Sequence, residues 1–182
     1  MNKYIYKTIL KNGTIVIIRF LRQTDRVYIE KGYKELSYKS QYFRFISPPS
    51  SLSDKDLKYL TEIDNINHVA MIAFAIEKPL KQPIGVARYI KLIDNPGSAE
   101  YAITVLDSYQ NQGLGTIFFN LLVDHARRNN INNLTGYILS ENLPMLKIVR
   151  HHNIHVRKEE GALLRVDLPL KTVNDKNKKA PA

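Results

Sequence analysis

The sequence contains no cysteine, which excludes disulfides, thiolate metal sites and a cysteine nucleophile. It also has no run that approaches the ~18 to 20 apolar residues a membrane-spanning helix requires. Residues 1–14 lack the long apolar stretch and the small-residue cleavage site of a signal peptide. These absences suit a reducing compartment, and we expect a cytoplasmic protein with no membrane partner.

The chain of 182 residues is long enough for one domain with a proper core, and 44% of its residues are apolar. Its net charge is +10, part of which belongs to the lysine-rich segment 171–182. A basic chain suits nucleic acid, a polyanionic small molecule or a merely solvated surface. Nucleic acid is the weakest of these, since no recognition helix or aromatic RNA platform is recognisable. We expect a single domain over residues 1–170 and a disordered basic tail over residues 171–182.

The apolar pattern predicts a mixed α/β domain, in which an antiparallel meander joins a βαβ-like half. Helices are expected at residues 24–36, where Thr24 or Asp25 offers a cap, and after Ser53, with Asp56 in the capping-box position. Two further helices are expected at residues 113–129 and 141–152. A strong turn signal lies at residues 94–97. Strands are expected at residues 14–21, 68–77, 83–93, 99–107, 133–140 and 161–168.

The segment Gln110–Gly115 lies between a predicted strand and a predicted helix, where free N–H groups and the helix dipole favour a phosphate. A P-loop would need a Lys-Ser/Thr pair after its last glycine, and Thr116-Ile117 stands there instead. A dinucleotide fingerprint would need a third glycine where the chain has Phe118. The remaining pattern, Q/R-x-x-G-x-G/A, resembles the pyrophosphate-binding loop of the GNAT superfamily of acyl-CoA N-acyltransferases.

Other motifs extend this resemblance to about residues 8–168, in the right order along the chain. Together they resemble the acetyltransferase domain of bacterial protein-lysine acetyltransferases that regulate acyl-CoA synthetases. The first is a strand ending in Ile18-Arg19, followed by an acidic residue and by the pattern LS..S.Y.RF, which begins at Leu36. The later ones are LTEID at 60–64, HVA at 68–70, PIGVARYI at 83–90, AEYAITVLDSYQNQGLGT at 99–116 and ENLPMLKIV at 141–149.

The resemblance implies a GNAT-like fold, with a central, mostly antiparallel twisted sheet that is splayed at the CoA site and flanked by helices. It implies acetyl-CoA as co-substrate and no metal. The backbone of Ile103 and Val105 would bind the pantetheine arm, and Asn142 would contact its end or merely cap the following helix. The amides of the glycine loop would bind the pyrophosphate, and these residues are Gln110, Asn111, Gln112, Gly113, Leu114, Gly115 and Thr116.

The implied reaction is direct attack of a primary amine on the thioester. An amine with a pKa near ~10.4 must lose a proton, and Glu100 matches the glutamate assigned as general base in this group. We expect partial burial beside Ala99 and Tyr101 to raise its pKa, although an exposed glutamate without a role is the alternative. The tyrosine that commonly protonates the thiolate is replaced by Val149, and the Gly-Phe that usually follows is replaced by a segment containing His151 and His152.

The preferred acceptor is a protein lysine, although a small amine such as a polyamine or an aminoglycoside fits equally well. The regulatory enzymes of this group carry further large domains, whereas we expect a stand-alone domain here. Four carboxylates could line an amine-binding cleft or simply form a solvated helix face: Asp54, Asp56, Glu62 and Asp64. A CoA-binding sensor with little catalysis remains the alternative function. The sequence does not indicate an oligomeric state.

Overall fold

The structure, a computed structural model, describes residues 5–77 and 80–170, so the tail expected to be disordered lies outside the described residues. Eight strands are described, namely β1 (Ile5–Ile9), β2 (Ile15–Phe20), β3 (His68–Glu77), β4 (Leu80–Leu92), β5 (Asn95–Val105), β6 (Asn133–Leu139), β7 (His155–Lys158) and β8 (Leu163–Pro169). Five α-helices accompany them, namely α1 (Arg26–Glu35), α2 (Tyr38–Phe45), α3 (Asp54–Thr61), α4 (Leu114–Arg128) and α5 (Leu143–Val149).

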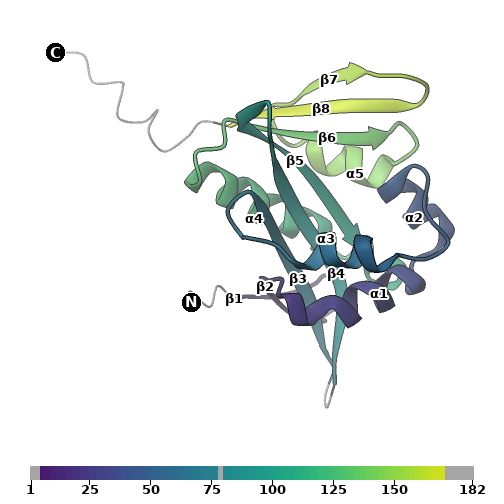
Figure 1. The fold of residues 1–182 in the computed structure, drawn as a ribbon. Coiled ribbons are helices and arrows are strands. Elements are labelled where there is room, and N and C mark those ends of the chain that lie inside the picture. Colours follow the sequence, from purple (N-terminus) through teal and green to yellow (C-terminus); the bar gives the residue numbers. More distant parts are fainter. Residues whose placement is uncertain (1–4, 78–79, 171–182) are drawn as a thin grey trace.

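The strands form one sheet in the order β1-β2-β3-β4-β5-β6-β8-β7 (Figure 1). Every neighbouring pair is antiparallel except β5 and β6, which run parallel. The mixed, mostly antiparallel sheet predicted from the sequence is therefore confirmed. Among the described residues, no helix is long and apolar enough to cross a membrane.

The central strands bury side chains on both faces of the sheet, with the alternation that a strand requires. On one face Met71 of β3 belongs to the same core as Phe118 of α4. On the other face Ile72 and Phe74 form a smaller cluster, against which Tyr28 of α1 packs. Figure 1 shows α1 and α3 on one side of the sheet and α4 on the other. β5 therefore belongs to a sheet whose two faces are covered by different helices.

Three elements were not predicted from the sequence: β1, α2 and β7. Helix α2 is only eight residues long and buries no residue completely, although Tyr38, Tyr42 and Phe45 are spaced as on one helical face. Strand β7 is exposed at all four positions, which removes the alternating pattern of a half-buried strand. The predicted turn at residues 94–97 is also wrong in position, because β4 runs to Leu92 and β5 begins at Asn95. The capping box that joins Ser53 and Asp56 at the start of α3 is confirmed.

Strands β5 and β6 pair at only three positions, the last of which joins Glu100 to Thr135. The next residues in register are Tyr101 and Gly136, and a Cβ atom on Gly136 would overlap the Tyr101 ring. The ring therefore occupies the space in which the strands would otherwise continue side by side. Beyond this point β5 remains paired with β4 as far as Val105, while β6 diverges from it (Figure 1). The splayed sheet is the feature that positions the candidate site.

Candidate active site

A cleft of about 300 Å³ opens where β5 and β6 separate. Its walls are residues 100–103 of β5, residues 136–139 of β6 and residues 43–46 at the end of α2, together with Asn142 and Met145. Three residues predicted to act at the site, Glu100, Ile103 and Asn142, therefore line one cavity. The cleft is open on the side of β5 that no longer carries a neighbouring strand.

The glycine loop follows β5 and leads directly into α4. Gly113 is the residue before the helix and has φ +95°, and Asn111 also has a positive φ of +59°. The first N–H groups of a helix have no carbonyl partner within it, and they carry the positive end of the helix dipole. Leu114 is buried in the core and Thr116 is exposed, so Leu114 can contribute to an anion site only through its backbone. The local geometry fits the predicted pyrophosphate site.

Two of the loop residues have a structural role that the sequence did not reveal. The side-chain Nε2 of Gln110 donates to the carbonyl oxygen of Val105 at 3.0 Å and to the hydroxyl of Ser40 at 3.1 Å. Gln110 thus links the loop to the end of β5 and to α2. Its hydrogen bond engages the carbonyl oxygen of Val105, a residue whose backbone was predicted to bind the pantetheine arm. A Cβ atom on Gly115 would lie 2.9 Å from Cδ1 of Ile148, so this glycine allows α4 and α5 to pack closely.

Lys11 lies beside the loop, and the sequence gave no reason to select it. Its backbone N–H donates to the carbonyl oxygen of Gln112 at 3.1 Å. Its Cε atom lies 4.0 Å from the position that a Cβ on Gly113 would take. The side chain is exposed, so its ammonium group is available beside the helix N-terminus. Lys11 lies about 100 residues before the loop in the sequence, so no local sequence pattern indicates this contact.

Glu100 lies at the last position at which β5 pairs with β6, and it lines the cleft. Its side chain is exposed, so the expectation that it would be partly buried between Ala99 and Tyr101 is wrong. Those two neighbours are themselves buried, because strand alternation turns Glu100 to the face opposite theirs. The carboxylate is accessible to an incoming group from the α1 and α2 side.

Asn142 is the residue before α5, and its Oδ1 accepts a hydrogen bond from the N–H of Met145 at 3.2 Å. It therefore does cap the helix, while its Nδ2 group makes no hydrogen bond to any residue within the described ranges. Asn142 can consequently cap α5 and still present an amide donor to the cleft. Val149, at the usual tyrosine position, is completely buried. His152 packs edge-on against Phe119, with ring centroids 4.9 Å apart.

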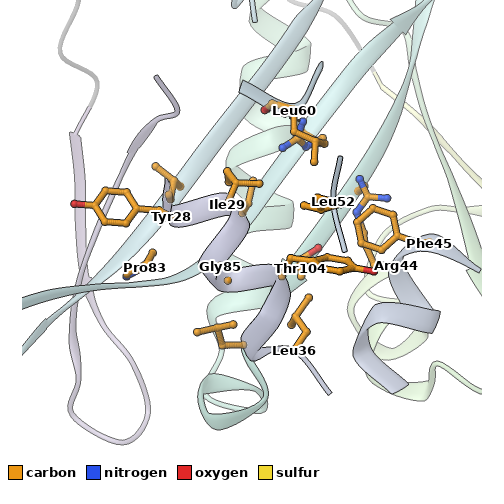
Figure 2. Close-up of a pocket in the computed structure, with 17 residues that line it drawn as sticks. Tyr28, Ile29, Leu36, Arg44, Phe45, Leu52, Leu60, Pro83, Gly85 and Thr104 are labelled. Carbon is orange, nitrogen blue, oxygen red and sulfur yellow. Dashed lines mark hydrogen bonds between the residues drawn. The ribbon is translucent and has the colours of Figure 1, made fainter. Parts of the chain in front are cut away.

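A second pocket, of about 70 Å³, lies on the face of the sheet covered by α1. Figure 2 shows Tyr28 and Pro83 on one side of it, with Arg44 and Phe45 opposite. Three residues line both the pocket and the cleft, namely Arg44, Phe45 and Ala102. Ala102 of β5 thus separates a larger cavity from a smaller one. We call the smaller cavity the α1 pocket.

Helix α2 is held at this junction by its first two serines. The carboxylate of Asp107, just beyond β5, accepts hydrogen bonds from the Ser37 hydroxyl at 2.7 Å and the Ser40 hydroxyl at 2.8 Å. This explains the pattern LS..S.Y.RF in physical terms. The serines tie α2 to the end of β5, and the final Arg44 and Phe45 then reach both cavities.

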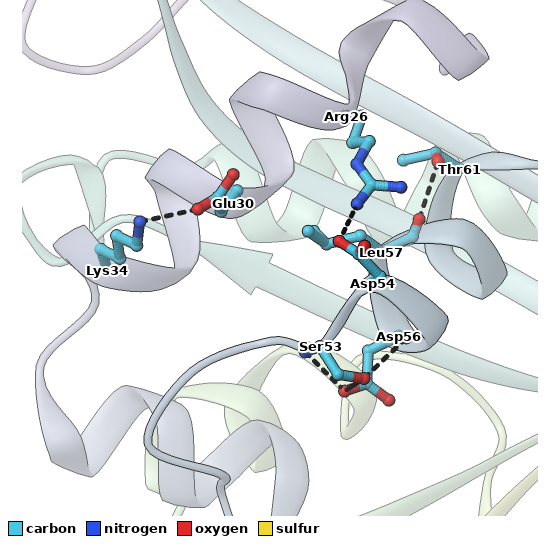
Figure 3. A network of polar contacts seen from close by, with 8 residues as sticks. All are labelled: Arg26, Glu30, Lys34, Ser53, Asp54, Asp56, Leu57 and Thr61. Carbon is cyan, nitrogen blue, oxygen red and sulfur yellow. Dashed lines mark hydrogen bonds and ion pairs between the residues drawn. The ribbon is translucent and has the colours of Figure 1, made fainter.

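The four carboxylates considered for amine binding line neither cavity. Asp56 completes the capping box with Ser53, and Asp54 forms an ion pair with Arg26 (Figure 3). Asp64 accepts hydrogen bonds from backbone N–H groups of residues 66–68, and Glu62 accepts one from Gln23. The structural and solvated interpretation of these acids is therefore supported. Within residues 5–77 and 80–170, no group of three or more His, Asp or Glu side chains could hold a metal ion.

The model of the acetyltransferase (GNAT) domain family matches residues 16–153, which is more than half of the chain. This chain belongs to the GNAT acetyltransferase family. A curated relative, acetyltransferase PA5475 of Pseudomonas aeruginosa, is 33% identical over 120 residues, covering 66% of this chain and 64% of that protein. Acetyltransferase Pat of Mycolicibacterium smegmatis is 32% identical over 143 residues, covering 76% of this chain and 41% of that protein. The matched part is thus less than two thirds of either relative.

Solved GNAT structures share the fold at lower identity. The GNAT domain of S. lividans PAT superposes with a TM-score of 0.81 at 22% identity, covering 91% of this chain and 97% of that chain. The yncA protein of Salmonella typhimurium, solved with its cofactor acetyl-CoA, gives a TM-score of 0.68 at 18% identity, covering 86% of this chain and 94% of that chain. The resemblance to the GNAT domain of Pat-type acetyltransferases is therefore confirmed.

Proposed function

We propose that this GNAT enzyme transfers the acetyl group of acetyl-CoA to a primary amine, preferably a protein lysine, with Glu100 as the general base. One observation carries the proposal: along β5, Glu100, the splayed cleft and the glycine loop occur in the order that the reaction needs. The exposed base lies in the middle of β5, and the candidate anion site follows the end of that strand. The space between them has room for an extended arm.

The residues of the chain fit acetyl-CoA as co-substrate. The loop from Gln110 to Thr116 offers helix N-terminal amides to the pyrophosphate, and the ammonium group of Lys11 adds a cation beside it. The backbone of Ile103 and the N–H of Val105 lie on the part of β5 beyond its last pair with β6. Asn142 offers its free Nδ2 group to the cleft. No metal is required by this assignment.

The chemical step breaks the C–S bond of the thioester and forms a C–N bond to the amine. An amine with a pKa near ~10.4 is protonated at neutral pH, and Glu100 removes a proton directly or through a water chain. The backbone N–H near Val105 is the proposed donor to the oxyanion of the tetrahedral intermediate. Val149 supplies no proton, so the thiolate leaves unassisted, which a thiol pKa near ~8.5 allows.

The protein-lysine acceptor is supported by the likeness to Pat acetyltransferases, although the match covers only part of that relative. A small amine is the second candidate for the acceptor. The cytoplasmic location expected from the sequence, a single domain over residues 1–170 and the absence of a metal stay predictions. An alternative function, a CoA-binding sensor with little turnover, would leave the exposed Glu100 without a role.

The replacement Glu100→Gln tests the proposal, because it removes the base and keeps the size of the side chain. We expect turnover to fall by at least ~100-fold, in the range that loss of a general base produces, with unchanged affinity for acetyl-CoA. Initial rates are measured as release of free CoA with lysine-containing peptides and with polyamines. Glu141→Gln, on the turn before α5, is the matched control and should keep the full rate. An undiminished rate in Glu100→Gln would remove this residue from the mechanism.

A further inference from the structure

Arg88 is an unusual buried cation on β4. Its residue is 5% exposed, and its side chain lines the α1 pocket. The Nη1 group donates to the carbonyl oxygen of Leu60 at 3.3 Å and to Nε2 of His68 at 3.0 Å. Arginine cannot accept a hydrogen bond, so the His68 nitrogen must be the unprotonated acceptor. Neither partner carries a negative charge.

The protonation of His68 supports this conclusion. Burial, followed by the positive charge of Arg88, lowers the pKa of His68 to about 4, so its ring is neutral at pH 7. Among the described residues no carboxylate lies within ion-pair distance of Arg88. No described carboxylate therefore balances the positive charge of this guanidinium in its largely apolar surroundings.

A second arginine lines the same pocket. The guanidinium of Arg44 lies over the Phe45 ring, 4.7 Å from its centroid, and donates no hydrogen bond to any residue that the structure describes. It also forms no ion pair with a described carboxylate. Burial, followed by the positive charge of Arg44, lowers the pKa of Arg88 to about 9, so both side chains are cations at neutral pH. The two like charges act on each other across the pocket.

Such an arrangement is costly for a folded protein. Buried charges are normally paired, because desolvation of an isolated ion is unfavourable and a nearby like charge adds to the cost. Asp54, Asp56, Glu62 and Asp64 all have structural partners outside the pocket. Glu100, on the same face, lines the cleft and acts electrostatically on Arg44, but it does not line the α1 pocket. No Asp or Glu is present among the described residues that line the α1 pocket. An anionic ligand group would supply the missing counter-ion.

We propose that the α1 pocket binds a carboxylate of the acceptor, held between Arg44 and Arg88. This inference rests on the proposed function, in which the amine reaches Glu100 from this face. The remaining wall is apolar and includes Tyr28, Ile29 and Ile72, so it excludes water and strengthens the charged hydrogen bonds. A volume of about 70 Å³ holds a carboxylate with a short carbon chain, not a second large group.

The position of the pocket sets where the acceptor's amine lies. Arg44 also lines the cleft, and the carboxylate of Glu100 acts electrostatically on it, raising a pKa that burial lowers. Arg44 therefore connects the proposed carboxylate site to the cleft that Glu100 lines. The carboxylate belongs either to an acidic residue next to the modified lysine or to the carboxyl group of a small amino acid.

Matched pairs of amines test the proposal and separate the two sources. The first pair is Nα-acetyl-lysine and its carboxamide, which differ only in the free carboxylate. The second pair is an N-acetylated, C-amidated Lys-Asp dipeptide and its Lys-Asn counterpart. Binding of each compound is measured by calorimetry with the protein saturated with CoA, and acetyl transfer is measured separately. We expect the carboxylate member of one pair to bind about 10- to 100-fold more tightly, as a charge-assisted contact with two arginines implies.

Two replacements connect any preference to the pocket. Arg44→Met and Arg88→Met each keep an apolar stem and remove one guanidinium. Either variant should reduce the preference for the carboxylate compound to less than about threefold. For acetyl transfer, KM should rise by a larger factor than kcat falls. The exposed Arg157, replaced by Met, is the control and should keep the preference. Arg88→Met could unfold the protein because Arg88 is bonded to Leu60, and Arg44→Met, which breaks no hydrogen bond within the described residues, then decides alone.

Equal binding of both members of both pairs would overturn the proposal, even if all four compounds were acetylated. A preference that survived in Arg44→Met would overturn it as well. Selective binding without any acetyl transfer would instead contradict the proposed function and leave the carboxylate site intact. If the carboxylate member binds more tightly in the first pair, the source of the carboxylate is a small amino acid. If it does so in the second pair, the source is an acidic residue next to the lysine in a protein.

Discussion

The two cavities that meet at Ala102 differ in volume and in the charged groups that line them. The cleft between β5 and β6 has a volume of about 300 Å³ and leads toward helix N-terminal amides and an exposed lysine. The α1 pocket has about 70 Å³, an apolar wall and two arginines without a carboxylate partner among the described residues. In our proposals the first supplies backbone donors to a large, extended molecule, whereas the second supplies side-chain cations to one small group. We infer that the donor is recognised mainly by backbone groups and the acceptor mainly by side chains.

The separation of strands β5 and β6, which opens the cleft, depends on Gly136, whose missing Cβ makes room for the Tyr101 ring. The replacement Gly136→Ala forces that ring to move, and we expect it to lower the free energy of unfolding by about 2 kcal/mol. Urea denaturation measures this change, and acetyl-CoA binding should weaken in parallel.

Gly32, within α1, is the matched control, because a Cβ built there meets no atom within 4 Å. Gly32→Ala should raise the stability by about 0.5 to 1 kcal/mol through helix propensity. A neutral or stabilising Gly136→Ala would contradict the account of the splayed strands.

The α1 pocket also gives the protein a sensitivity to acid. Burial, followed by the charge of Arg88, lowers the pKa of His68 to about 4 in the folded state from its ordinary value of 6.5. The unfolded chain therefore binds more protons between these values, and stability is lost as the pH falls from about 6.5 to 4. Because His68 is only half-buried, solvent screening reduces this contribution below the ~1.4 kcal/mol that each unit of pKa represents for a fully buried group.

Chemical denaturation of wild type and His68→Gln at several pH values measures this contribution. The variant should lose less stability than wild type over that window, because its amide does not titrate. Identical slopes in the two proteins would contradict the neutral acceptor assigned to His68. Arg88 would then need another partner, and the charge argument for the pocket would weaken.

On the side of the cleft, Lys11→Ala should weaken acetyl-CoA binding by about 3- to 10-fold, because an exposed cation contributes modestly beside an anion. The loss should shrink as salt is added, since the charge is solvent-exposed. Titrations at low and high ionic strength measure it. Lys7, four residues earlier and also exposed, is the control, and an equal effect of Lys7→Ala would indicate only the general basic charge.

The sequence predicted the cleft better than the pocket, for a physical reason. The glycine loop is local: a strand, two glycines and an amphipathic helix fix the geometry of Gly113 within a few residues. The α1 pocket is not local, because Arg44 of α2 and Arg88 of β4 meet only through the fold. The pattern LS..S.Y.RF contained Arg44 all along, yet only the bonds from Ser37 and Ser40 to Asp107 show why it reaches both cavities.

Two predictions about single residues show the same limit. The expectation that Glu100 is partly buried was wrong, because the sequence around it does not reveal which face of β5 is covered at that point. Asn142 was left between a cap and a ligand contact, and the structure confirms the cap while leaving its Nδ2 group free among the described residues. Helix α2 was missed altogether, although Tyr38, Tyr42 and Phe45 have the spacing of one helical face, because a helix of eight residues offers only two turns of pattern.

The measurement that tests the central claim most directly is a calorimetric titration of acetyl-CoA into wild type and Gly113→Glu. Gly113 has φ +95° and begins α4, so a glutamate there is strained and places a negative charge at the anion site. Gly161→Glu is the matched control, because Gly161 also has a positive φ and a Cβ there meets no atom within 4 Å. We predict saturable micromolar binding to wild type and to Gly161→Glu, and none to Gly113→Glu. Failure of wild type to bind, or unchanged affinity in Gly113→Glu, would contradict the assignment of this loop to acetyl-CoA.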